Sequence, residues 1–159
     1  MGKLRYVTST KKYDPGERLT RNFVMEEFAS CDGYIVWNEL TELFMLMLQE
    51  LRDWIRGAVP VSCIYRSPAF NKKIGGAANS MHLLGLAADI PWRGVKPGYL
   101  SAGAARRKEI EDNIVEFWKK TCVKYGIKGG SVELCDAHFH LDIREWQDGK
   151  FRVYRGESK

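Results

Sequence analysis

The clearest hydrophobic pattern of the chain lies in residues 38–57. Apolar residues recur there at helical spacing, namely Leu40, Leu43, Phe44, Leu48, Leu51 and Ile55. Asn38 is a suitable cap for the first turn, and Gly57 is a suitable stop after the last one. The pattern predicts a long helix whose apolar stripe faces the core.

A second helical pattern follows in residues 101–126. Ser101 is expected to start this helix, and Gly126 is expected to end it. Its apolar face is made of Ile110, Ile114, Phe117, Cys122 and Tyr125. The sequence therefore predicts one long helix in each half of the chain.

The remaining apolar segments predict short strands. They cover residues 59–67, 86–90, 131–135, 139–146 and 149–154. Turn-forming residues such as Pro68 predict loops at 68–80 and 92–100. Strands that cluster after each helix favour an α+β fold, a single domain in which a small, mostly antiparallel sheet packs against the two long helices.

Length and composition set the domain organisation. The chain has 159 residues, 45% of them hydrophobic, which is enough for one core without disulfides. We expect an N-terminal extension at 1–21, one folded domain at 22–155 and a C-terminal tail at 156–159. The four cysteines show no C-x-x-C spacing, so reduced thiols are expected.

The charge and the N-terminal segment limit the partners and the location. The net charge is +5, but the basic residues are scattered among 20 acidic ones, so no nucleic-acid partner is expected. The first residues contain no apolar run of the length that a signal peptide or membrane span requires. We expect synthesis in the cytoplasm, no membrane association and a monomer.

All three histidines lie in two short segments, and this concentration is the main clue to function. His82 and Asp89 lie seven residues apart, so the chain must fold back between them to bring both to one metal ion, and Gly85 allows that reversal. Strand periodicity places His138 and His140 on one face. Imidazole and carboxylate ligands are typical of a catalytic zinc site, which either of these two histidines could complete.

These residues form motifs that resemble a known family. The first motif is Ser80-x-His82-x-x-Gly85-x-Ala87-x-Asp89, the second is His140-x-Asp142, and Tyr65-Arg66-Ser67-Pro68 precedes both. They resemble the zinc D-alanyl-D-alanine carboxypeptidases and peptidoglycan endopeptidases, which include many phage endolysins and share a zinc fold with the hedgehog signalling domain. The resemblance covers about residues 22–144 and marks 22–155 as a zinc peptidase domain.

The resemblance implies a role for each matching residue. It implies that zinc is bound by His82, Asp89 and His140 at the sheet. Arg66 would hold the substrate or its developing oxyanion. Ser80 would support the metal loop and the substrate side of the site, and Asp142 would orient a ligand. The aromatic residues Tyr65 and Trp92 are candidates for the substrate groove.

The general base departs from the family pattern. Many relatives have an acidic residue three positions before the last zinc histidine, where this chain has Ala137. His138 is therefore the first candidate for the base, Asp136 the second and Glu133 the third.

The resemblance implies a hydrolase that cuts bacterial peptidoglycan. We expect a zinc metallopeptidase, acting as carboxypeptidase or endopeptidase on stem or cross-link peptides near D-alanine, with Zn²⁺ as cofactor. It would act on the cell wall after release, as a phage lytic enzyme does. Two alternatives remain open, a non-catalytic zinc-stabilised binding domain and a D-alanyl-D-alanine dipeptidase.

Overall fold

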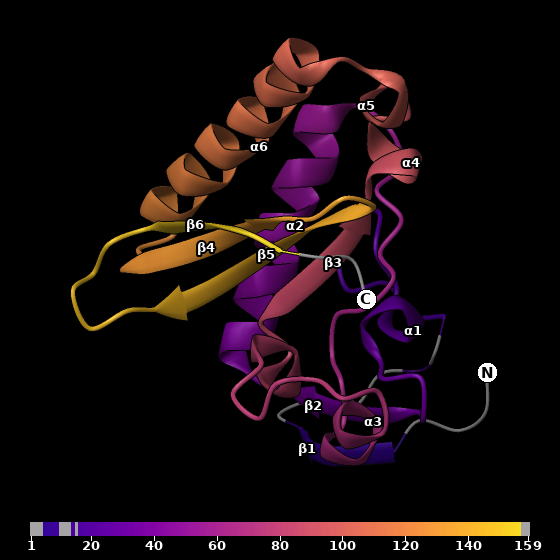
Figure 1. The fold of residues 1–159 in the computed structure, drawn as a ribbon. Coiled ribbons are helices and arrows are strands. Elements are labelled where there is room, and N and C mark those ends of the chain that lie inside the picture. Colours follow the sequence, from indigo (N-terminus) through magenta and orange to yellow (C-terminus); the bar gives the residue numbers. More distant parts are fainter. Residues whose placement is uncertain (1–4, 10–13, 15, 157–159) are drawn as a thin grey trace.

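Two long helices dominate the computed structural model, which describes residues 5–9, 14 and 16–156 (Figure 1). Helix α2 spans Glu39–Ile55, and the side chain of Asn38 accepts hydrogen bonds from the first-turn N–H groups, as predicted. Its last turn is closed by Arg56, which takes the left-handed conformation one residue before the predicted stop at Gly57. Helix α6 spans Ala104–Lys124 and begins after Gly103, slightly later than the sequence predicts.

A four-stranded sheet has the order β3-β5-β4-β6. Its strands are β3 (Ala87–Pro91), β4 (Gly129–Leu134), β5 (His138–Glu145) and β6 (Arg152–Arg155). Strand β5 pairs antiparallel with both β3 and β4, whereas β6 pairs parallel with β4. The fold is thus α+β with a mostly antiparallel sheet, which confirms the predicted fold class.

A second, two-stranded sheet lies apart from the first. Strand β1 (Arg5–Ser9) pairs in parallel with β2 (Tyr34–Trp37). Strand β1 falls within residues 1–21, which the sequence predicts to be an extension. This segment is therefore tied to the rest of the chain by backbone pairing.

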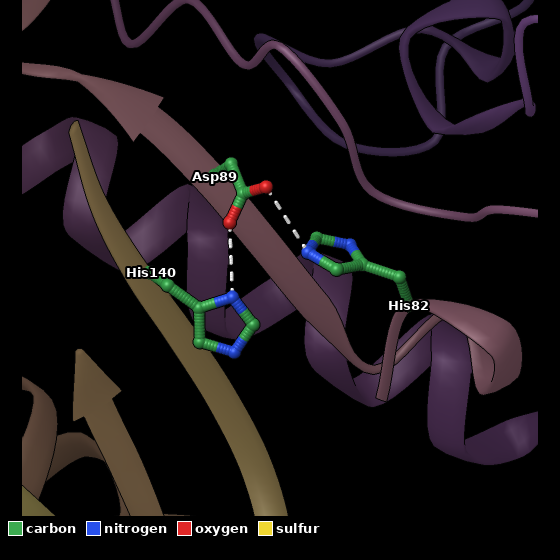
Figure 2. Close-up of side chains that lie close together, drawn as sticks. All are labelled: His82, Asp89 and His140. Atoms are coloured by element: carbon green, nitrogen blue, oxygen red, sulfur yellow. Dashed lines mark hydrogen bonds and ion pairs between the residues drawn. The ribbon is translucent and has the colours of Figure 1, made fainter. Parts of the chain in front are cut away.

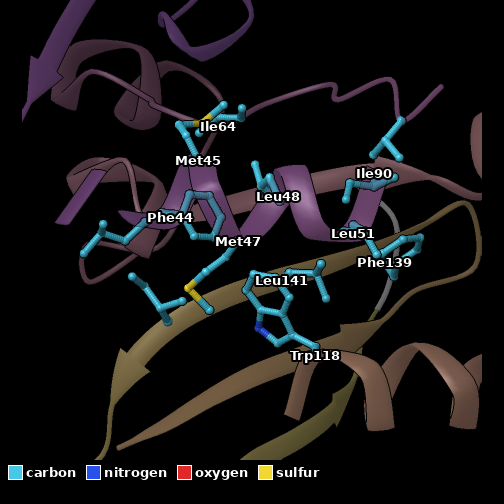
Figure 3. Close-up of a cluster of buried hydrophobic side chains, with 14 of the residues drawn as sticks. Phe44, Met45, Met47, Leu48, Leu51, Ile64, Ile90, Trp118, Phe139 and Leu141 are labelled. Carbon is cyan, nitrogen blue, oxygen red and sulfur yellow. The ribbon is translucent and has the colours of Figure 1, made fainter. Parts of the chain in front are cut away.

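The two faces of the large sheet differ in character. Alternate side chains of β3, β5 and β4, such as Ile90, Phe139 and Leu141, are fully buried in one apolar cluster with α2 and α6 (Figure 3). Trp118 of α6 packs edge-on against Phe44 in this cluster. The intervening positions of the strands point to the opposite face. That face is not filled by the core, so it is available for a site.

Several connections are more regular than the sequence predicts. The segment expected as a loop at 68–80 contains α3 (Pro68–Lys73), which Ser67 caps, and the segment 92–100 contains α4 (Trp92–Val95) and α5 (Gly98–Ser101). Proline at or just before the first turn of a helix costs no backbone hydrogen bond, so the prolines that predict loops here are compatible with helix starts. The short helix α1 (Met25–Phe28) and the 3₁₀ helix η1 (Met81–Leu84) complete the fold.

The strand predicted at 59–67 does not form. One isolated bridge pairs Cys63 with Asp89 at the outer edge of β3. The backbone partner then changes, since Tyr65 donates to Phe28 and Arg66 donates to His82. A ladder cannot continue when successive residues bond to different segments. Among the described residues, no helix has the length and apolar character to cross a bilayer.

Candidate metal centre

Three side chains from three elements converge on the polar face of the sheet. His82 comes from η1, Asp89 from β3 and His140 from β5. One possible ligand atom of each lies within 4.8 Å of the others. Figure 2 shows the three side chains pointing toward one another, with Asp89 between the two imidazole rings.

Sheet register brings two of the three together. Asp89 lies directly opposite His140 in the antiparallel pair β3–β5. Residues opposite each other share one face of the sheet, and their side chains are close enough to interact. His140 Nδ1 lies 2.9 Å from Asp89 Oδ1. The same register places His138 opposite Pro91 and Asp142 opposite Ala87, so both also lie on this face.

A tight turn delivers the third residue. Ser80 caps η1 through the backbone N–H of His82, and Gly85 ends it with a left-handed φ of 69°. The predicted chain reversal between His82 and Asp89 therefore occurs at Gly85. His82 is only 3% exposed, and its Nε2 lies 3.2 Å from Asp89 Oδ2.

In His82 and His140, the ring nitrogen that does not face Asp89 has its own partner in the protein. Nδ1 of His82 lies 2.8 Å from the carbonyl oxygen of Ile64. Nε2 of His140 lies 3.0 Å from Asp142 Oδ2, while the other carboxylate oxygen of Asp142 accepts from the backbone of Arg144. Partners of this kind fix the orientation of metal-binding imidazoles. Two imidazoles and one carboxylate, each held in place, match a three-ligand zinc site.

The charges of the cluster stabilise one another. Burial alone would raise the pKa of Asp89, but hydrogen bonds from His140 and His82 hold that pKa well below its usual range. Burial would lower the pKa of His82, yet its contacts with Asp89 and Cys63 raise it to about 10. Despite burial, contacts with Asp142 and Asp89 also raise the pKa of His140. In the metal-free protein the carboxylate is therefore ionised, and protons compete with a metal for the imidazoles.

Arg66 and His138 stand at the edge of this cluster. Nη2 of Arg66 lies 3.9 Å from Asp89 Oδ2, and Asn71 Oδ1 accepts from Nη1 at 3.0 Å. The Nε of Arg66 is buried and has no hydrogen-bond partner among the described residues. Nε2 of His138 lies 3.9 Å from Asp89 Oδ1. Both are close enough to act beside a metal held by the three residues.

The other sequence-predicted residues are placed differently. Tyr65 is 2% exposed and stacks on Phe28, and Trp92 is fully buried against Tyr99, so neither lines a groove. The prediction that they line a substrate groove is therefore corrected, because their rings pack in the core against Phe28 and Tyr99. Asp136 is exposed in the bend before β5, outside the cluster.

Glu133 lies in register with the cluster. It stands directly opposite His140 across the β4–β5 pair. It also lines a groove of about 400 Å³, together with His140 and Asp142. The groove is bounded by η1 and the segment before it on one side and by the ends of β5 and β6 on the other.

Two neighbours of the cluster, Cys63 and Arg144, are not among the site residues predicted from the sequence. Cys63 bridges to Asp89 through the backbone, and although burial would raise the pKa of its thiol, a contact with His82 lowers it. Arg144 lines the groove two residues after Asp142. Their spacing from the motif residues could have indicated both. Cys63 precedes Arg66 by three residues, and Arg144 alternates with His140 and Asp142 along β5.

Comparison with known proteins identifies the family. The sequence matches the family described as Peptidase M15 over residues 19–123, well over half of the chain. The matched segment contains Arg66, His82 and Asp89 and ends before β4 and β5. The position of His140 beside the other two is thus an observation independent of the match. No curated protein and no solved structure matches the chain.

Proposed function

The chain belongs to the peptidase M15 family and is therefore a hydrolytic enzyme, and from that premise we propose that it is a zinc metallopeptidase of bacterial peptidoglycan. We assign the zinc ligands to His82, Asp89 and His140. The bonds cut would lie in stem or cross-link peptides near D-alanine. The enzyme would work as a monomer on the cell wall after release from the cell that makes it, as a phage lytic enzyme does.

One observation carries the zinc assignment. The β3–β5 register sets Asp89 against His140, and η1 brings the buried His82 to the same point, with all three donor atoms within 4.8 Å. The remaining nitrogen of each histidine is bonded to Ile64 or Asp142. These partners hold both imidazoles with their other nitrogen toward Asp89, which is the orientation that a shared metal ion requires.

The residues around the ligands divide the work of peptide hydrolysis. Zinc in a site with three protein ligands supplies a Lewis acid and lowers the pKa of a bound water to about 7. Arg66 can hold the carbonyl oxygen as negative charge develops on it, because Asn71 fixes its guanidinium and its Nη2 lies beside Asp89, 3.9 Å from Oδ2. Arg66 would thus both position the substrate and stabilise the transition state.

His138 is our assignment for the general base. It shares the face of β5 with His140, and its Nε2 is near Asp89, whereas Asp136 is exposed and outside the cluster. A neutral imidazole at this place can take the proton of the attacking water and pass it to the leaving amine. Glu133 is farther along the same face, opposite His140, and is the second candidate on this geometry.

Two alternatives make different use of the same centre. The first is a zinc-stabilised binding domain without catalysis, and its basis is Ala137, which stands where many relatives carry an acidic residue. A D-alanyl-D-alanine dipeptidase would need only a small pocket. The groove of about 400 Å³ that extends from His140 along the sheet supports a longer peptide substrate instead.

Digestion of purified cell walls tests the proposal. Zinc-loaded protein should release new amino groups from peptidoglycan, and mass spectrometry of several wall chemotypes should locate the cleaved bond. One zinc per chain, measured by elemental analysis, should be lost in His82→Ala together with activity. Tight zinc binding without cleavage of any wall preparation or free stem peptide would establish the binding-domain alternative.

A further inference from the structure

The groove beside His140 contains one cation without a counter-ion. Arg144 donates from Nη2 to the carbonyl oxygen of Asn79 at 2.7 Å, while its Nε is buried and has no hydrogen-bond partner. Among the described residues, no carboxylate lies within 4.0 Å of its guanidinium. The protein covers this Nε, but Arg144 as a whole is only half-buried and its Nη1 makes no hydrogen bond among the described residues, so a ligand can reach the guanidinium at its Nη groups.

The other arginine of the groove and the carboxylate of Asp142 are already engaged. Arg155 makes two contacts of 3.1 Å with the buried carboxylate of Glu111. Asp142 accepts from His140 and from a backbone N–H. Arg144 is therefore the cation on this groove that is free to bind an anion.

A fixed aromatic ring holds Arg144 in place. Its guanidinium lies 5.1 Å from the ring centre of Trp146, whose Nε1 donates to Ser131 Oγ at 3.1 Å. Arg152 lies over the same ring at 4.1 Å but is paired with Asp148. Stacking fixes the plane of a guanidinium and presents its N–H groups in a fork that fits a carboxylate.

We infer that the groove is a substrate subsite in which Arg144 binds a free carboxylate of the peptide. This inference rests on the proposed function. It adds to it a preference for a peptide with a free carboxylate over the same peptide with that group amidated. Because His140 and Asp142 line the same groove, the carboxylate would bind close to the proposed metal ligands. Charge-assisted hydrogen bonds to an arginine of this kind correspond to roughly tenfold to a hundredfold in affinity.

Matched peptides test the subsite directly. We would use a stem peptide of alternating L and D residues with an acidic residue, made with its side carboxyl free or amidated and, separately, with its terminal carboxyl free or amidated. Calorimetric titration of zinc-loaded protein gives the binding constants, and mass spectrometry of the same samples reports cleavage. Wild type should bind one of the free carboxylates about tenfold to a hundredfold more tightly than its amide.

Substitutions then assign the preference to one arginine. Arg144→Gln should abolish it, and Arg144→Lys, which keeps the charge, should retain part of it. Arg152→Gln is the matched control because Arg152 stacks on the same Trp146 but is neutralised by Asp148, and it should leave the preference unchanged. Zinc content should be one per chain in all of them.

The outcomes separate the subsite from the peptidase. Equal affinity of wild type for both members of every pair would overturn the subsite, even if the peptides are cut. An equal loss of affinity for the free acid and for the amide in Arg144→Gln would also overturn it. The role of Arg144 would then be structural, through its hydrogen bond to Asn79. A preserved acid preference without any cleavage would support the subsite and contradict the proposed hydrolysis.

Discussion

Asp89 and His140 face each other across the β3–β5 pair, and His140 Nδ1 lies 2.9 Å from Asp89 Oδ1. Because this contact follows from strand register, the sheet itself aligns the carboxylate and the imidazole. His82 is held less directly, by a 3₁₀ turn and by the carbonyl oxygen of Ile64. The centre therefore combines a rigid pair on the sheet with one ligand on a turn.

Removing the shared carboxylate should remove the metal. Asp89→Asn preserves the size of the side chain but loses the charge that faces both imidazoles, so zinc content should fall from one ion per chain to well below that. Asp142 contacts the ligands only at Nε2 of His140, so Asp142→Asn should weaken zinc binding or activity by about tenfold to a hundredfold. Elemental analysis and competition with a chelating dye measure both. Zinc content in Asp89→Asn equal to wild type would contradict the ligand assignment.

Zinc binding should strengthen with pH well above the usual range of histidine. The pKa of His82 is raised to about 10 in the metal-free site, so at pH 7 a bound ion must displace its proton. For one displaced proton, the apparent affinity should rise about tenfold per pH unit between about pH 7 and 9. Calorimetry in buffers of different ionisation enthalpy counts the released protons. An affinity that levels off near pH 6.5 would show that His82 is not protonated in the free site.

The same contacts should give the metal-free protein a defined pH range of stability. The raised pKa of His82 stabilises the folded state fully below its unfolded value near 6.5, and this contribution is lost as pH rises through about 10. The lowered pKa of Asp89 stabilises the folded state above about pH 4, and that contribution is lost as the pH falls below this value. Thermal melts in a chelator should show both contributions in full between about pH 4 and 6.5. Asp89→Asn should flatten the profile on both sides.

His138 and Asp136 can be separated by paired substitutions. His138→Gln should lower kcat by about a hundredfold to ten-thousandfold with zinc content unchanged, because a proton carrier is lost and a ligand is not. Asp136→Asn should have little effect, since Asp136 is exposed and outside the cluster. Initial rates of amino-group release from peptidoglycan provide the measurement. Near-normal turnover by His138→Gln would move the base to Glu133, which stands opposite His140.

Local features of the site could be predicted from the sequence. The cap at Asn38 and the reversal at Gly85 depend on neighbouring residues, and both occur where expected. Alternation along β5 likewise places His138 and His140 on one face. Features of this kind are encoded within a few residues, so spacing is enough to find them.

Non-local features could not be predicted in this way. The groove depends on β6 returning parallel to β4, which brings Tyr154 opposite Glu133, and no pattern within either strand indicates that pairing. Tyr65 and Trp92 were expected at the substrate but are buried, because aromatic residues beside a motif resemble aromatic residues of the core in a sequence. Burial depends on what packs from elsewhere in the chain.

The turn that carries His82 should be sensitive to a single methyl group. Gly85 has a φ of 69°, and a Cβ there would lie 2.6 Å from Cζ of Phe28 and 3.1 Å from Cγ2 of Thr41. Phe28 is fully buried and cannot move aside. Gly85→Ala should therefore combine the left-handed penalty of about 1 to 2 kcal/mol with an overpacking cost of about 1 to 3 kcal/mol. Urea unfolding of the zinc-free protein measures the sum.

Gly75 offers the matched control for this prediction. Its φ of 71° is nearly the same, but nothing lies within 4 Å of a Cβ built on it. Gly75→Ala should be destabilised only by the left-handed penalty, and its zinc affinity should equal that of wild type. Gly85→Ala should also bind zinc more weakly, because the N–H of Gly85 bonds to the carbonyl oxygen of His82 and a shift of the turn moves that ligand. Equal losses of stability in the two variants would mean that Phe28 accommodates the methyl group and that the turn tolerates displacement.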